Sequence, residues 1–498
     1  MSLGHRLRVL PTFGPRFAVL AFLLLGLPVA VLFALLVQLG DVADEPAHLV
    51  RAASLLDGQF VGHRESIALP DGSSVVAAGV TVAPLWGALS QSREPTDVSK
   101  RADPQPAPSL GRGAWDETRR FAPIYTISTY FPVFYVPAAL GLGAARLAAL
   151  PPRDAAVAGR LANVLAYALM AVAALALSRR GRPLIFVALT LPMSLSLAGS
   201  FNQDGLMIAA AVLAVALASR SWTSDAADDR FAAPAMILAA VLVGLVALAK
   251  PPYALLAAIL LGRLPWRDGI RVWGPLALRR GGLAVLAVLP AAVWTVYVTA
   301  TVSTPFPRPA YEAGPLWPGP QPTIFTSTDP KAQLRVLIEE PVRFVTIPFH
   351  YLLTIKHIKG LLASMIGIIG WLDRSFPIPL YYLWTLALLA ALVPARRPPP
   401  GRTLPDFALL AAAALVCAWA IVLSQYLTWT AVGLPRVDGP QGRYLLPILP
   451  LLALLLPEGE GLPKDEAGEG WRRAARLLPV AAAAIDLVVV PIRVPGMA

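Results

Sequence analysis

Long apolar runs alternate with short polar, arginine-rich segments along most of the chain. Several runs approach the ~20 residues that an α-helix needs to cross the hydrocarbon core of a bilayer. The pattern predicts an all-α polytopic membrane protein of about eleven transmembrane helices. The predicted crossings lie near 17–39, 155–177, 183–197, 205–218, 232–249, 283–302, 378–393 and 407–425, with a short helix before Arg263, another from Gly442 and a weak last one containing Asp486.

The first apolar run, 17–39, follows a basic flank that contains Arg6, Arg8 and Arg16. At roughly 23 residues it is longer than the core of a signal peptide, and no A-x-A cleavage site precedes Asp41. We therefore expect an uncleaved first helix whose N-terminus lies in the cytoplasm. Asp41 then lies just outside the membrane.

Arginine clusters orient the remaining runs. Arg179, Arg180 and Arg182 are best placed in the cytoplasm, because short cytoplasmic loops carry an excess of Lys and Arg. The run 155–177 is then the second crossing, and the proline-broken run 130–150 is expected to be a juxtamembrane helix on the outer face. Continuing the alternation predicts two large outer segments, at about 41–154 and 303–376. It also places in the cytoplasm a basic loop that carries Arg263, Arg267, Arg271, Arg279 and Arg280.

The two outer segments differ in pattern. From Asp41 to about Tyr125 we expect a long polar loop with short amphipathic pieces. The second segment starts Pro-rich and ends in an amphipathic stretch that we place in the outer interface. Residues 1–457 are interpreted as one transmembrane domain, and 458–498 as a cytoplasmic loop with the last helix.

Composition supports the membrane assignment and narrows the partners. The chain is 56% hydrophobic and only 14% charged, against roughly 25% charged residues in soluble domains. Its net charge of +12 comes from loop arginines, which suit anionic lipids better than nucleic acid. The single cysteine, Cys417, lies in an apolar run, which excludes a disulfide framework and a thiolate metal site.

A polar stripe begins directly after the first helix. If Pro46 starts a helix, Asp44, His48 and Arg51 project from one side of it and Glu45 lies at the edge of that side. Such a stripe is either a reaction centre or a polar helix start, since acidic residues also stabilise a first helical turn. Asp44 and His48, with Asp204, are also the candidates for a divalent metal, although a lone histidine near carboxylates is more often a hydrogen-bond partner.

Further polar residues are predicted on the same face as this stripe. Carboxylates beside Lys and Arg at the end of a helical bundle suit a site that handles a phosphate and a hydroxyl. Each also has a structural reading, as a turn, a snorkelling lysine or an interfacial anchor. The residues are Asp41, Asn202, Asp204, Lys250, Asp373, Gln441, Arg443 and Tyr444.

Five motifs occur in order along the chain: DEPAHLVR, SFNQDGL, KPPY, GWLD and QGRYLLPILP. Together they resemble a bacterial family of predicted membrane proteins, catalogued as domain of unknown function 2142. That family in turn resembles the GT-C superfamily of integral-membrane glycosyltransferases. The similarity covers about residues 16–457, and the first and last motifs are the most specific. It implies a GT-C-like helical bundle in the bacterial plasma membrane, with its active face outside.

The resemblance also implies substrates and roles. The donor would be a polyprenyl-phosphate-linked sugar, and the acceptor a cell-envelope glycan or lipid; no cofactor is certain. The base would be a carboxylate of the first outer loop, which indicates Asp44, with Glu45 as close rival and Asp41 as third choice. Asp204 matches a second acidic position, and Lys250 and Arg443 match positions suited to the donor's phosphate. Direct attack assisted by one base predicts inversion at the anomeric carbon.

Two non-catalytic interpretations stay open at this point. A transporter or flippase of lipid-linked saccharide needs the same phosphate contacts and also polar groups along a path through the bundle. Charges inside the predicted spans are sparse, with Asp486 as the main exception, and this disfavours transport. An envelope-assembly subunit would instead use its outer loops to bind a partner protein.

Overall fold

The computed structural model describes residues 13–68, 72–86, 115, 118–223, 229–305, 328–372, 374–392, 404–456 and 469–494. Within these ranges the protein is predominantly helical, and seven helices are long and apolar enough to cross a membrane. The protein is therefore a multi-pass membrane protein, as predicted. These spans are α2–η1–α3 (Pro15–Ala21, Phe22–Gly26 and Leu27–Leu36), α7 (Pro152–Leu177), α10 with its last turn (Asp204–Trp222), α11 (Ala232–Ala249), α12 (Ile270–Thr301), α17 (Leu404–Thr428) and the apolar part of α19 (Ala475–Arg493).

The other four predicted crossings correspond to shorter or broken elements. Prolines explain the breaks, because a residue before proline avoids the helical region. Leu191, for example, is extended (ψ 137°) just before Pro192 and divides the third run in two. The elements are α8 (Arg182–Thr190) with α9 (Pro192–Ala198), the 3₁₀ helix η7 (Pro251–Leu261), α16 (Ile378–Ala391), and η10 (Gly442–Leu445) with α18 (Leu451–Leu455).

Helix α10 (Asp204–Ala218) is the central helix of the bundle. All its residues are buried, and a helix that is apolar all round belongs in a core. It packs against α7, α9 and α11. Because Asp204 is its first residue, this carboxylate is fixed at one end of the core.

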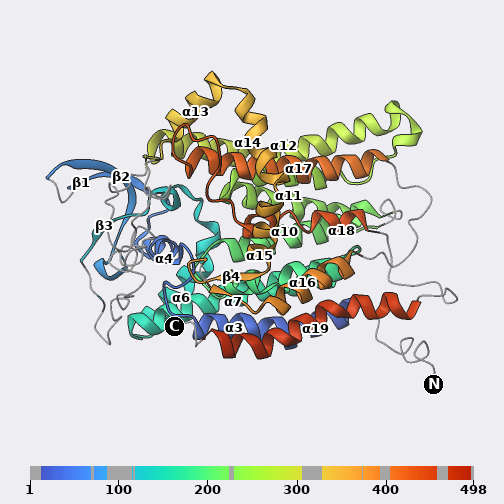
Figure 1. Cartoon of the computed structure of the whole chain (residues 1–498), viewed down its shortest axis with the longest axis horizontal. Coiled ribbons are helices and arrows are strands. Elements are labelled where there is room, and N and C mark those ends of the chain that lie inside the picture. The colour runs from blue at the N-terminus through green and yellow to red at the C-terminus, as the bar shows by residue number, and fades with distance from the viewer. Residues whose placement is uncertain are drawn as a thin grey trace.

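One end of the bundle carries the elements described within the predicted first outer segment (Figure 1). There lie α4 (Glu45–Ser54), α6 (Val136–Leu147) and a small antiparallel sheet, with the 3₁₀ turns η2 (Leu55–Asp57), η4 (Tyr125–Thr129) and η5 (Pro132–Tyr135). We call it the α4 end. Helix α6 packs against α4 and α7, at the position predicted for a juxtamembrane helix.

The sheet was not predicted, because the segment from Asp41 to Tyr125 was interpreted as a polar loop. Its strands are β1 (His63–Ala68), β2 (Ser74–Val82) and β3 (Arg120–Pro123), in the order β1-β2-β3. The valine-rich β2 has the β-branched composition that favours strands. Gly79 is required in it, because a Cβ there would lie 2.2 Å from the carbonyl oxygen of Ala122 on β3.

The described residues of the predicted second outer segment form short helices and a two-stranded ribbon. They are α13 (Pro330–Glu339), α14 (Val342–Leu353), α15 (Ile355–Gly367), β4 (Ile368–Ile369) and β5 (Arg374–Ser375). The last helix, α19 (Glu469–Arg493), packs against α16 and α3. Helix α12 is longer than predicted, since it begins at Ile270 and includes arginines that we had placed in the preceding loop.

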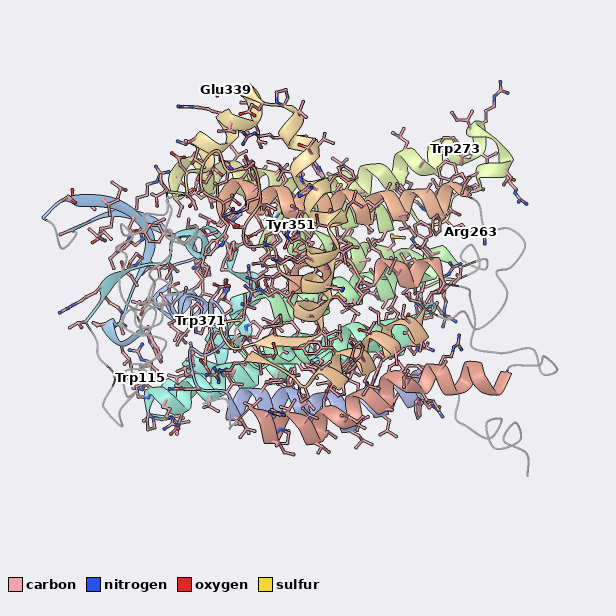
Figure 2. The ribbon with its side chains drawn as sticks, viewed as in Figure 1. Trp115, Arg263, Trp273, Glu339, Tyr351 and Trp371 are labelled. Carbon is pink, nitrogen blue, oxygen red and sulfur yellow. The ribbon has the colours of Figure 1, made fainter. Side chains whose placement is uncertain are left out.

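Two labelled residues show how the ends differ. Trp371, between β4 and β5, lies at the α4 end, whereas Arg263, predicted in a cytoplasmic loop, lies at the opposite end (Figure 2). Residues predicted on opposite faces of the membrane are thus at opposite ends of the bundle.

Candidate functional site

Asp44 adopts an unusual backbone conformation just before α4. Its φ of 66° and ψ of −4° place it in the left-handed region, which is uncommon for a residue with a side chain and recurs at functional sites. Its side chain makes no capping hydrogen bond to α4. Asp44 thus occupies the N-cap position of α4 while its carboxylate stays free of a capping role.

Four charged side chains from distant parts of the chain form one row of ion pairs. Asp44 Oδ2 lies 2.5 Å from Arg443 Nη2. Arg443 Nε lies 3.8 Å from Asp204 Oδ2, and the other oxygen of Asp204 lies 2.6 Å from Lys250 Nζ. Two carboxylates thus alternate with two cations, and their formal charges balance, which makes their burial tolerable.

The members of this row differ in access to solvent. The Asp44 side chain is 40% exposed, whereas the Arg443 and Asp204 side chains are 3% and 2% exposed. Lys250 is intermediate, and its ammonium lies 4.6 Å from the centre of the Tyr444 ring. Asp44 is therefore the open end of the row, and Asp204 is its buried anchor.

The row lines a cavity of about 210 Å³ at the α4 end. Aromatic rings make up much of the remaining wall. The lining includes Asp44, His48, Tyr125, Tyr130, Asp204, Lys250, Trp371, Gln425, Trp429, Gln441, Arg443 and Tyr444. Most of the predicted site residues therefore share one cavity.

His48 lies in this cavity wall and is held by tyrosines. Its Nδ1 lies 2.6 Å from the hydroxyl of Tyr135, and its ring stacks on Tyr130 and Tyr135. Burial lowers the pKa of His48 to about 4, although Asp44 and Asp204 oppose the shift. The imidazole is therefore neutral near pH 7, and Tyr135 rather than Asp44 orients it.

Glu45, the neighbour of Asp44, points away from the cavity. Its carboxylate is fully buried and accepts two hydrogen bonds from Arg160, at 2.8 and 2.6 Å. The backbone N–H groups of Gly40 and Phe201 also donate to it. Glu45 thus holds the start of α4 against α7, and the structure separates it from the residues of the row.

Two other predicted residues also have structural partners. Asp41 pairs with Arg374 of β5 at 2.7 Å. Arg51 donates to the backbone carbonyls of Gln59, Phe60 and Tyr130, so its guanidinium supports the loop after α4 and does not line the cavity. Asp373 lies outside the described residues.

Asn202 positions the row without lining the cavity. Its side-chain oxygen accepts from the backbone N–H of Asp204, and its amide group donates to the carbonyl of Ala43. Asn202 therefore fixes the loop of Asp44 relative to the first residue of α10.

Several residues of this region were missed by the sequence analysis. Four aromatic residues could not be recognised from the sequence, because single aromatic residues are common in membrane proteins: Tyr130, Tyr135, Trp371 and Trp429. Arg160 could have been recognised, because it is a charged residue within the predicted second crossing, and such residues usually have a partner or a function.

The donor set does not fit the divalent metal considered for Asp44, His48 and Asp204. One oxygen of Asp44 and both oxygens of Asp204 already face a cation, and His48 Nδ1 is engaged by Tyr135. Among the described residues, no group of three or more His, Cys, Asp or Glu side chains is placed to hold a metal ion.

A family model described as predicted membrane proteins, DUF2142, matches residues 27–452. No curated protein and no solved structure matches the chain. The matched range includes every member of the ion-pair row and covers most of the 498 residues. The chain therefore belongs to the DUF2142 family of predicted membrane proteins.

Proposed function

We propose that this protein is a membrane glycosyltransferase that moves a sugar from a polyprenyl-phosphate donor to a cell-envelope glycan or lipid. The observation that carries the proposal is one cavity lined by an accessible carboxylate, Asp44, by Arg443, with which it pairs, and by a second cation, Lys250. Transfer from a lipid phosphate needs this combination, a base for the incoming hydroxyl and positive charge for the leaving phosphate. The family that the five motifs indicate in turn resembles the GT-C superfamily, and this resemblance supports the same reading.

The donor phosphate binds to Lys250 and Arg443 in this proposal. Arg443 offers forked donors that match phosphate oxygens, while Lys250 acts as a point charge. Asp204 holds both cations from the buried side, so their positions are set before the donor arrives. Preorganised charges of this kind stabilise the growing negative charge without reorganising during the reaction.

Asp44 acts as the base. The acceptor oxygen attacks the anomeric carbon while its proton passes to the Asp44 carboxylate. The bond from the anomeric carbon to the phosphate oxygen breaks, and polyprenyl phosphate leaves with the bonding electrons. A single displacement inverts the anomeric configuration. Glu45 is not assigned this role, because Arg160 and two backbone N–H groups surround its carboxylate.

The rest of the cavity suits a sugar. Trp371 and Trp429 offer flat apolar faces on which a sugar ring stacks. The side-chain oxygen of Gln441 is buried and has no hydrogen-bond partner among the described residues, so it is available to a sugar hydroxyl. Neutral His48 adds a further polar group that carries no charge.

The proposal includes the orientation in the membrane. The α4 end faces the outside of a bacterial plasma membrane and the N-terminus lies in the cytoplasm, as the arginine distribution predicts. The four short or broken elements then complete about eleven crossings.

Product analysis tests the function. Purified protein in lipid nanodiscs is incubated with a panel of polyprenyl-phosphate sugars and envelope lipids, and mass spectrometry and NMR follow the products. We expect released polyprenyl phosphate and an acceptor glycosylated with inverted anomeric configuration. Movement of a lipid-linked sugar across a vesicle membrane without a glycosylated product would contradict the proposal and favour a carrier.

A further inference from the structure

A second cavity of about 300 Å³ adjoins the first and has no role so far. It lies among η7, α12, α17 and the first residue of α13. The two cavities share part of their walls, including Tyr130, Lys250, Gln425 and Tyr444. Lys250 and Tyr444 therefore stand at the junction of two adjoining spaces.

The second cavity differs from the first in charge. Among the described residues that line it, Lys250 carries the only charge, and no carboxylate is present. Leu248, Trp294, Val298 and Ile421 give it apolar walls. An anionic group at Lys250 thus has a charged, polar space on one side and an uncharged space on the other.

Several hydroxyl residues also line this cavity and, taken alone, would favour a polar ligand. Four of these hydroxyls, however, donate to their own backbone segments, whereas the buried hydroxyl of Thr304 has no hydrogen-bond partner among the described residues. Thr295 donates to Ala291 O at 2.7 Å and Ser424 to Ile421 O at 2.7 Å. Thr428 and Thr129 make the same kind of bond. These threonines are thus largely satisfied internally and leave their methyl groups for an apolar ligand.

The helices around this cavity connect it to the lipid-facing surface. Helices α12 and α17 each pack against η7, and over their described residues they do not pack closely against each other. Helix α12 is the least buried of the seven long spans, and Val296, on its outer side, is 72% exposed. The α12 side of the second cavity therefore borders the surface that faces lipid.

We infer that the second cavity holds the first part of the apolar chain of a lipid phosphate, whose phosphate lies at Lys250 and whose sugar lies in the first cavity. The inference rests on the proposed function for the identity of the ligand. It assigns a direction to the substrate: the chain lies towards α12 and α17, and the sugar towards Asp44 and Trp371. Access is lateral, from the membrane.

Photolabelling tests the assignment without requiring transfer. The probe is a polyprenyl phosphate with a diazirine on the unit nearest the phosphate, bound to the full-length protein in nanodiscs. We expect labelled peptides from the ends of α12 and α17 that line the cavity, and loss of labelling when unlabelled polyprenyl phosphate competes. Labelling that does not respond to the competitor would reflect bulk lipid and would overturn the inference.

Two threonines of α12 provide a matched pair of variants. Both are exposed, but Thr299 lines the cavity and Thr301 does not. Thr299→Trp should fill the space and reduce the labelling that unlabelled polyprenyl phosphate removes about tenfold. The same labelling in Thr301→Trp should stay within about twofold of the wild type. Equal effects of the two variants would contradict the inference. Protection by a soluble acceptor oligosaccharide instead of the lipid phosphate would also overturn it, in favour of a glycan site.

The result separates the inference from the proposed function. Competed labelling at α12 and α17 without any glycosyl transfer would refute the function and leave the chain site intact. Transfer accompanied by labelling elsewhere would refute the chain site and leave the function intact.

Discussion

Replacing Glu45 by glutamine should destabilise the protein without removing its base. Among the described residues, four groups donate hydrogen bonds to the Glu45 carboxylate: two N–H groups of Arg160 and the backbone N–H groups of Gly40 and Phe201. A glutamine amide would turn its NH₂ towards at least one of these donors. Arg160 would also keep a buried charge without its counter-ion, since its side chain is 3% exposed.

The size of the effect follows from the burial of the pair. Removing one partner of a buried ion pair costs about 3–5 kcal/mol of folding free energy. Arg160 also donates to the carbonyls of Ala34, Val37 and Gln38, which soften the loss. We therefore expect a value near the lower bound, about 3 kcal/mol.

Thermal unfolding in detergent, followed by tryptophan fluorescence, measures this change. Glu339→Gln is the control, because it makes the same chemical change at a residue that lies on the exposed surface of α13 (Figure 2). Glu45→Gln should lower the melting temperature by several degrees and Glu339→Gln should leave it unchanged. Below the melting temperature, the Glu45 variant should keep a transfer rate within a few-fold of the wild type. Unchanged stability combined with lost transfer would refute the structural role and restore Glu45 as a base.

Two further changes test other parts of the α4 end. Between pH 6.5 and about 4, His48 binds a proton in the unfolded chain but not in the folded protein. Lowering the pH through this window should therefore reduce the free energy of unfolding by about 3 kcal/mol through this group. His48→Asn should remove that loss, and equal pH profiles of the two proteins in denaturant unfolding would contradict the prediction. A Cβ at Gly442 would clash with the carbonyl oxygen of Leu361, so Gly442→Ala should displace Arg443 and lower the melting temperature. Gly433 is the control, because a Cβ there meets open space and only its positive φ opposes a side chain. Gly433→Ala should therefore lower the melting temperature less.

Much of the bundle was predictable because it depends on apolar length. The run at 232–249 became α11 at the same residues, and 155–177 became most of α7. Runs that contain proline were harder, since Pro192 and Pro450 interrupt helices that hydropathy alone would continue. The small sheet was missed because strands in a polar segment give a much weaker pattern than spans.

That Asp44, Asp204, Lys250 and Arg443 lie together could be predicted, because the arginine pattern placed their loops on one face. The difference between Asp44 and Glu45 did not follow, because it depends on one backbone torsion. The left-handed conformation of Asp44 separates two adjacent carboxylates, one into the cavity and one into the core. Helical spacing had placed both near one stripe, and a sequence pattern contains no information on this turn.

The transfer rate of Asp44→Asn tests the central claim most directly. The measurement is a single-turnover experiment with saturating polyprenyl-phosphate sugar, alongside donor binding by the same protein. Asp57→Asn is the matched control, since Asp57 belongs to the same outer segment and pairs with Arg119 away from the cavity. We predict a rate about 10²–10⁴ times lower for Asp44→Asn with donor affinity nearly unchanged, and a normal rate for Asp57→Asn. A normal rate for Asp44→Asn would contradict the assignment of Asp44 as the base.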